Sequence, residues 1–133
     1  MRFALATVVA AALDHVVLLR VDQWIGVSAI LAIGYLLVAS AGAGFFAGTR
    51  SALAGALAVL GGVLLSGLIQ YWPRFSYAND LGVLLGFELQ LLVAFVPYEL
   101  GGAIAGYFGG IARIRIVRAG RASPAPTEPQ SRP

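Results

Sequence analysis

Residues 25–48 read IGVSAILAIGYLLVASAGAGFFAG and contain no charged side chain in 24 positions. A helix needs about 20 largely apolar residues to cross the hydrocarbon core of a bilayer, so this stretch predicts a membrane-spanning helix. Residues 52–72 read ALAGALAVLGGVLLSGLIQYW and are equally free of charge, so they predict a second one. Only the short turn from Gly48 to Ser51 separates the two, which therefore form an antiparallel hairpin.

Two further apolar segments flank this hairpin. Residues 3–19 are interrupted only by Asp14 and His15. The last stretch, residues 81–112, would measure about 48 Å as one helix, which exceeds a hydrocarbon core of about 30 Å. We expect it to tilt, to kink at Pro97 or to begin as an interfacial segment, with a span over residues 83–112.

The composition agrees with a polytopic membrane protein. Hydrophobic residues make up 59% of the 133 residues and charged residues 11%. Soluble domains carry about 25% charge, so a water-soluble enzyme domain is excluded. There is no cysteine, which excludes a disulfide scaffold. The sequence thus predicts an all-α integral membrane protein with four transmembrane helices, over about residues 3–19, 25–48, 52–72 and 83–112.

The distribution of arginine predicts the orientation. Four spans place both termini and the Gly48–Ser51 turn on one side, together with Arg2 and Arg50. Five of the nine arginines lie in the last 21 residues, and we expect this C-terminal cluster to attract anionic lipid headgroups. The basic side should be cytoplasmic, with both the N- and C-termini inside a cell membrane, which we expect to be a bacterial inner membrane. Residues 119–133 are rich in arginine and proline and predict a disordered cytoplasmic tail.

The N-terminus leaves one alternative open. Arg2, a short apolar run and three alanines at positions 10–12 resemble a cleaved signal peptide. The apolar run before the alanines is short for a signal peptide, so we expect the segment to be a retained span.

Small residues form two matching stripes, 62 positions apart. AGFFAG at 43–48 is echoed by AGYFGG at 105–110, and residues 3–19 and 52–72 share a fainter pattern at an offset of 56. We interpret these matches as a duplicated helical hairpin, although the abundance of Gly, Ala and Phe also produces short matches. Small residues at every fourth position let helix backbones approach closely in lipid. A glycine zipper is therefore expected at Ser40, Gly44, Gly48, Gly102, Gly106 and Gly110.

Polar side chains gather toward the outer side, where Arg20 and Arg74 are offset by Asp22 and Asp80. At 1.5 Å per residue, most lie within roughly 10 Å of that boundary, so we expect an outward-facing polar pocket above a tightly packed, dry inner half. Charged groups inside a bilayer are costly and usually face protein or water, although a shallow position or an arginine partner reduces the cost. The candidate pocket residues are Asp14, His15, Ser66, Gln70, Glu88 and Glu99.

Other chemistry has little support in the sequence. A metal site needs several converging ligands, and the chain has one histidine with scattered carboxylates. Ser66 as a nucleophile would depend on His15, which lies on another helix. Glycine pairs lie within apolar segments without a following lysine, unlike a phosphate-binding loop. We expect no enzymatic activity, no cofactor, no metal and no nucleic-acid partner.

Three functions remain open. The favoured one is a non-enzymatic scaffold or accessory subunit that assembles, with itself or within a larger membrane complex, through small-residue helix faces. The second is a small transporter or channel that uses Asp14, Glu88 and Glu99 around the outward pocket. A holin-like pore former, suggested by the small size and basic tail, is the third. The scaffold is preferred because the inner half offers no polar path to the cytoplasm.

Overall fold

The computed structural model describes residues 1–20, 29–78 and 81–122. Its secondary-structure elements are four α-helices. The helices are α1 (Arg2–Arg20), α2 (Ala29–Ala47), α3 (Ser51–Ala78) and α4 (Leu81–Ala122). No strand occurs in these three ranges. Residues 21–28, 79–80 and 123–133, which include Asp22, Asp80 and most of the expected tail, lie outside the described part of the chain.

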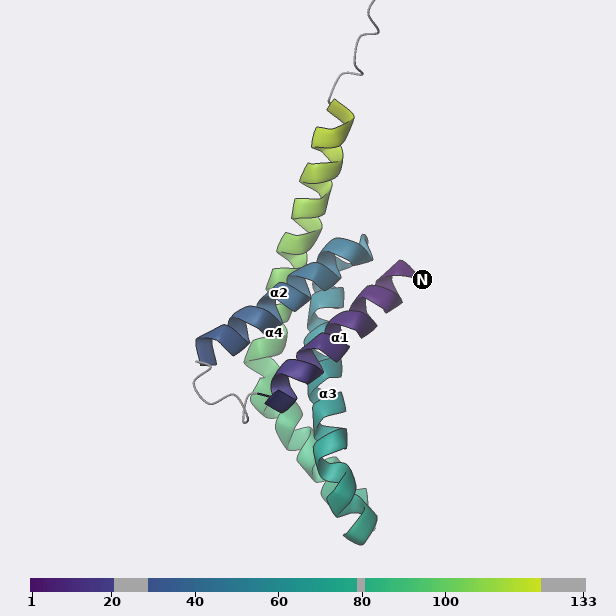
Figure 1. Ribbon diagram of the computed structural model, residues 1–133, viewed down its shortest axis with the longest axis vertical. Coiled ribbons are helices and arrows are strands. Elements are labelled where there is room, and N and C mark those ends of the chain that lie inside the picture. The colour runs from purple at the N-terminus through teal and green to yellow at the C-terminus, as the bar shows by residue number, and fades with distance from the viewer. Residues whose placement is uncertain (21–28, 79–80, 123–133) are drawn as a thin grey trace, which may run out of the picture.

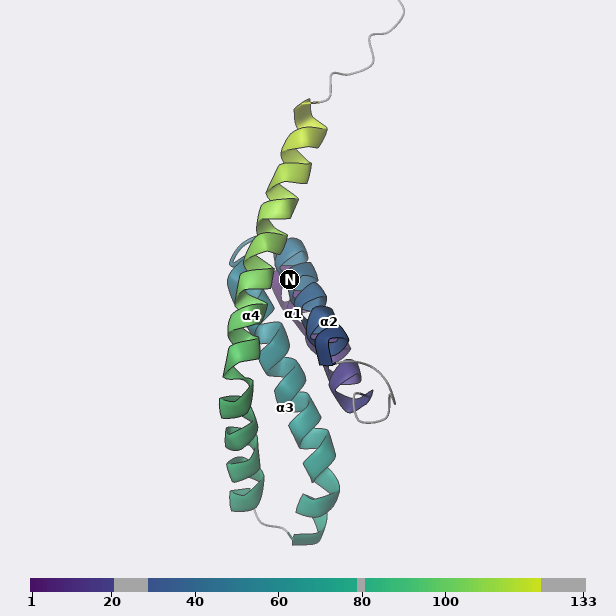
Figure 2. The ribbon, with the colours of Figure 1, turned by 90° about the vertical axis from the view of Figure 1, so that its left-hand side faces the viewer.

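The four helices form two inclined pairs. Helices α3 and α4 run antiparallel side by side, and α1 and α2 cross them obliquely on one side (Figures 1 and 2). Helix α4 packs against both α2 and α3, whereas no contact joins α1 to α4 within the described ranges. The N-terminus, the turn after α2 and the C-terminal end of α4 all lie toward one end of the molecule (Figure 1).

Three of the helices are long and apolar enough to cross a membrane. The candidate spans are Ile30–Ala47, Ser51–Pro73 and Leu81–Arg121. This agrees with a multi-pass membrane protein. The expected fourth span corresponds to α1, whose side chains are described as far as Val16.

Helix α4 is longer than the sequence predicts. Its 42 residues continue through Pro97 and give a length of about 63 Å. Its last turns, in yellow-green, extend past the other three helices (Figure 2). Residues 119–122, which we assigned to the disordered tail, are helical, because Ala and Arg favour a helix and the first helix-breaking proline is Pro124.

The turn between α2 and α3 is tight and uses left-handed backbone. Gly48 has φ +81° and Arg50 has φ +55°. Glycine adopts this conformation without the steric cost that a Cβ atom brings. Gly48 therefore ends α2 as a C-terminal cap and allows α3 to begin at Ser51.

Small side chains dominate the core. Alanines from three helices form its centre, and valines of α3 extend it. Because these side chains are short, neighbouring helix axes lie close together. The buried hydrophobic residues are Ala10, Leu36, Ala43, Ala47, Ala54, Ala58, Val59 and Val63.

The two hairpins of the expected duplication, α1 with α2 and α3 with α4, differ in their packing. Helix α2 contacts α3, whereas α1 and α4 make no contact within the described ranges. A strict twofold relation between the hairpins would make these two pairs alike. The lengths differ too, with 19 residues in α1 and α2 against 28 and 42 in α3 and α4. The duplication thus stays a prediction from the sequence.

Candidate functional site

A polar contact joins α1 to α3 in the interior of the bundle. His15 and Ser66 are both buried, and His15 Nδ1 lies 2.9 Å from Ser66 Oγ in a hydrogen bond. The serine hydroxyl is able to donate or accept, so it suits either tautomer of the imidazole. This bond fixes the rotation of α1 relative to α3, because it joins residues 51 positions apart in the chain.

Asp14 lies beside this pair and is completely buried, with an exposed fraction of 0%. It packs against Gly62 of α3, where an added Cβ would come within 2.7 Å of the Asp14 Cβ. Neither carboxylate oxygen has a hydrogen-bond partner among the described residues. Buried polar groups are costly unless they are paired, so these two oxygens are open acceptors for a donor or a cation.

Glu88 makes a similar contact between α4 and α3. Its carboxylate lies over Gly67, where an added Cβ would fall 2.5 Å from Oε1 and 2.8 Å from Oε2. Both oxygens are buried and unpaired within the described part of the chain. Because Ser66 and Gly67 are consecutive, they lie about 100° apart on α3. Asp14 and Glu88 therefore approach α3 from different faces.

The remaining predicted pocket residues lie apart from this cluster. Gln70 is exposed on α3, and Glu99 is half-buried on α4. Glu99 is eleven residues from Glu88, about 16 Å along the helix, and its Oε1 is also buried without a partner in the described ranges. The structure thus brings Asp14, His15 and Ser66 together and sets Glu88 on the neighbouring face of α3.

The His15–Ser66 contact has the residue types of a nucleophile and its base, but the backbone around it is unsuited to acyl transfer. Such chemistry needs donors aimed at a developing oxyanion, commonly backbone N–H groups. Ser66 lies within the continuous helix α3, whose backbone N–H groups are used in helical hydrogen bonds. The chemical role that this geometry supports is an interhelical hydrogen bond. Within the described residues, no three His or carboxylate side chains converge as metal ligands.

The predicted helix-packing residues lie at the other end of the bundle. Helix α2 crosses α4 obliquely there (Figure 1), and Gly44 lies directly against Gly106, backbone to backbone. One turn earlier, an added Cβ on Gly102 would be 3.2 Å from Ser40 Oγ, and Ser40 is completely buried. Both contacts join positions 62 apart. No side chain larger than hydrogen fits at Gly44 or Gly106 without displacing backbone.

The last two predicted packing residues face other partners. Gly110 packs on Ser51 of α3, where an added Cβ would be 2.7 Å from the Ser51 Cβ. Gly48 lies under the guanidinium group of Arg113. Because glycine has no side chain, there is room for this group.

Two close contacts were absent from the predicted set. Gly55 of α3 lies against the Gly102 carbonyl, with an added Cβ also 2.9 Å from the Gly106 Cα. Gly109 lies against the backbone of Ala41 on α2. The spacing of Ser51 and Gly55 is itself a pair of small residues four positions apart, so this signal could have identified the α3 side of the contact.

Comparison of the chain with protein-family models, with curated proteins and with solved structures finds no match.

Proposed function

We propose that this protein is a non-enzymatic scaffold or accessory subunit of a membrane assembly, formed by self-association along α4. The glycine contacts at Gly44, Gly55, Gly102 and Gly106 act within one chain as a glycine zipper. These glycines are already buried in the packing of α2, α3 and α4 within one chain, so assembly between chains uses a different surface. The outward face of α4, which carries exposed apolar side chains, offers such a surface.

The observation that supports this proposal is a continuous apolar stripe on α4. From Leu89 to Tyr107 its members follow one another at spacings of three or four residues, and all are exposed. At 100° per residue they cover about 80° of the helix surface, away from the glycine face. From Leu89 to Tyr107 the spacing averages about 3.6 residues, the period of one helix face, so the stripe runs along one side of α4. The stripe consists of Leu89, Val93, Val96, Leu100, Ile104, Tyr107 and Ile114.

The end of α4 gives a second reason. About half of its length of about 63 Å exceeds a hydrocarbon core of about 30 Å. Its last turns carry exposed Ile114, Ile116 and Val117 among exposed arginines. Exposure of apolar side chains to water is unfavourable. A neighbouring chain would cover the side chains that project from the bundle.

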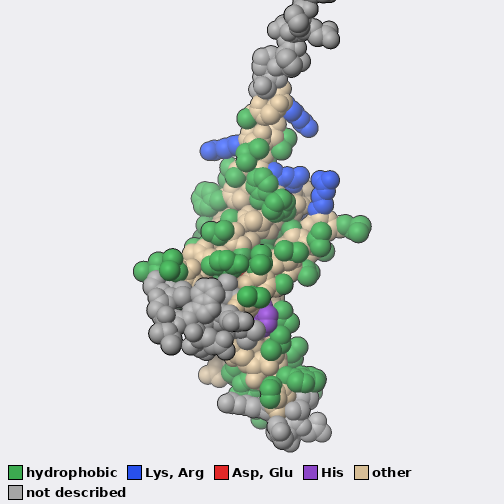
Figure 3. Space-filling view, viewed as in Figure 1, with side chains coloured by type: hydrophobic (Ala, Val, Ile, Leu, Met, Phe, Trp, Pro, Cys, Tyr) green, Lys and Arg blue, Asp and Glu red, His purple; other side chains and the backbone are tan. Residues whose placement is uncertain are grey.

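The proposed orientation follows the arginines. Arg2, Arg50 and Arg113 belong to the end of the molecule where α4 leaves the bundle. Figure 3 shows arginine side chains gathered there, and no acidic side chain of a described residue is visible on this face. We assign this end to the cytoplasm of a cell membrane, with both termini inside.

The absence of cysteine allows a direct test of the assembly. Single-cysteine variants Leu100→Cys and Ile104→Cys place one thiol on the stripe. Tyr98→Cys places one at a similar depth, about 160° around the helix from Leu100 and about 120° from Ile104. After oxidation in native membranes, a disulfide-linked dimer is expected for the first two variants and not for the third. Equal cross-linking of all three, or none, contradicts the proposal and leaves lipid as the covering of this face.

A second candidate, a small transporter or channel, is favoured by the buried carboxylates of Asp14 and Glu88, which lack partners in the described ranges. Vesicles containing Glu88→Gln, Glu99→Gln or Asp14→Asn chains would be assayed for proton and cation flux beside the unaltered protein. Loss of flux with unchanged unfolding free energy supports transport. Absence of flux in the unaltered protein, with dimer formation on the α4 stripe, supports the scaffold.

A further inference from the structure

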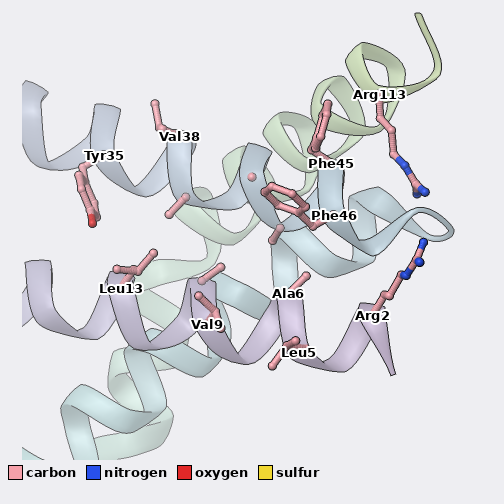
Figure 4. Close-up of a pocket in the computed structure, with 14 residues that line it drawn as sticks. Arg2, Leu5, Ala6, Val9, Leu13, Tyr35, Val38, Phe45, Phe46 and Arg113 are labelled. Carbon is pink, nitrogen blue, oxygen red and sulfur yellow. The ribbon is translucent and has the colours of Figure 1, made fainter. Parts of the chain in front are cut away.

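A cavity opens between α1 and α2, away from the buried polar cluster. Its volume is about 630 Å³, within the range of about 300 to 1,000 Å³ typical of ligand sites. Aliphatic and aromatic side chains from both helices form its walls (Figure 4). The largest of them are Leu5, Leu13, Tyr35, Phe45 and Phe46.

Two arginines close one end of this groove. Arg2 of α1 and Arg113 of α4 both line it, and their guanidinium groups converge on the same end in Figure 4. Gly48 leaves room for the Arg113 guanidinium group, because a side chain at position 48 would collide with it. None of the described residues that line the groove carries a carboxylate. Within the described residues, no ion pair or hydrogen bond neutralises either arginine.

The length of the groove along the inclined axes of α1 and α2 is close to the thickness of one membrane leaflet. On α1 it extends from Arg2 to Leu13 and on α2 from Tyr35 to Phe46, eleven residues in each case, or about 16 Å. Half of a hydrocarbon core of about 30 Å is about 15 Å. The charged end is therefore at the height of the headgroups when the apolar part lies among the acyl chains.

We infer that this groove binds one anionic phospholipid from the leaflet on the arginine-rich side. Its phosphate lies between Arg2 and Arg113, and an acyl chain fills the space between α1 and α2. Guanidinium groups suit phosphate because they form paired, charge-assisted hydrogen bonds, and basic pockets between membrane helices are known to take anionic headgroups. The site is independent of the proposed self-association, because α4 contributes only Arg113 to it and its apolar stripe faces elsewhere.

The charged end is tested by titrating the full-length chain in detergent with phosphatidylglycerol or phosphatidylcholine and counting bound lipid by native mass spectrometry. We expect one molecule of phosphatidylglycerol to bind tightly and phosphatidylcholine to bind more weakly. Replacing Arg2 and Arg113 by glutamine should raise the dissociation constant for phosphatidylglycerol about 25-fold, that is about fivefold for each arginine. The matched control Arg118→Gln/Arg121→Gln removes the same charge from the exposed end of α4 and should leave the constant nearly unchanged.

The apolar part is tested separately by filling the groove. Gly42 lines it, and nothing lies within 4 Å of a Cβ added there, so Gly42→Leu occupies the space without displacing the backbone. Gly34→Leu on the same helix is equally unobstructed and lies outside the groove. We expect lipid binding to be lost in Gly42→Leu and retained in Gly34→Leu, with both chains folded by circular dichroism.

Three results would overturn the inference. One is equal binding of the two lipids, and another is equal weakening by the two arginine pairs, which would indicate diffuse attraction. The third is displacement of the lipid by inorganic phosphate alone, which would show that the arginines bind a free anion and that the groove is not used.

Discussion

The two ends of the helical bundle are held together in different ways. At the arginine-rich end, glycine removes side chains so that backbones meet, as between Gly44 and Gly106. Toward the other end, glycine makes room for a polar side chain of the neighbouring helix, as Gly62 does for Asp14 and Gly67 for Glu88. The same residue type therefore serves backbone contact in one half and polar contact in the other.

This difference has an energetic meaning. Lipid is as apolar as the helices, so dispersion at close backbone approach stabilises the glycine end, and any added atom must displace backbone. At the polar end one hydrogen bond stabilises the contact between α1 and α3, and the unpaired carboxylate beside it opposes it. Substitutions at the glycine end should therefore lower the free energy of unfolding, whereas a substitution at the polar end is able to raise it.

The largest effect is expected for Gly106→Leu. An added Cβ would lie 2.5 Å from the Ser51 carbonyl oxygen and 2.9 Å from the Gly55 Cα, both backbone atoms of α3. We expect a loss of about 3 kcal/mol or more in the free energy of unfolding, because overpacking against backbone leaves no side chain to yield. The measurement is reversible unfolding in detergent, followed by circular dichroism.

Gly86→Leu is the matched control, since α4 leaves open space at Gly86. Its unfolding free energy should stay within about 0.5 kcal/mol of the unaltered chain. Equal destabilisation by both substitutions would mean that the glycine contacts do not set the spacing of α2, α3 and α4.

A gain in stability is expected for Asp14→Val. Valine has a volume similar to that of aspartate, retains the Cβ that lies against Gly62 and removes two buried oxygens that lack partners in the described ranges. We expect the free energy of unfolding to rise by about 1 to 3 kcal/mol, the cost of an unsatisfied buried polar group. The same unfolding assay checks it, with Asp14→Asn as the polar control. A destabilised Asp14→Val chain would show that the carboxylate binds a partner that stabilises the fold.

The smallest effect is expected for the hydrogen bond between His15 and Ser66. A double-mutant cycle with His15→Ala and Ser66→Ala should give a coupling free energy of about 0.6 kcal/mol, as is usual for hydrogen bonds between membrane helices. Thr7→Ala serves as the control, because the Thr7 hydroxyl donates to the Phe3 carbonyl of its own helix. A cycle of Thr7→Ala with His15→Ala should show no coupling, and a similar value in both cycles would contradict the interhelical role.

The sequence was sufficient to predict the helical class and the main spans. Apolar runs of about 20 residues allow few alternatives in a chain with so little charge. The end of α4 was predicted less well, because hydropathy falls at the arginines around Arg113 while helix propensity does not. Residues 119–122 were therefore assigned to the tail although they continue the helix.

The site was harder to predict for a different reason. Spacing shows which faces of a helix have room, but the partner depends on the tilt and rotation of whole helices. Glu88 and Asp14 share a similar depth and still approach α3 from different faces. The groove between α1 and α2 arises from the inclination of these two helices. The local sequence around Arg2 therefore did not predict it.

The tight turn after α2 has a consequence for biosynthesis. Three residues, 48–50, join Ala47 to Ser51, so the end of one helix stays within about 14 Å of the start of the next even when the link is fully extended. During translation, one helix is therefore unable to enter the bilayer while the start of the other stays in water far from it. The two helices should therefore partition into the membrane as a single hairpin.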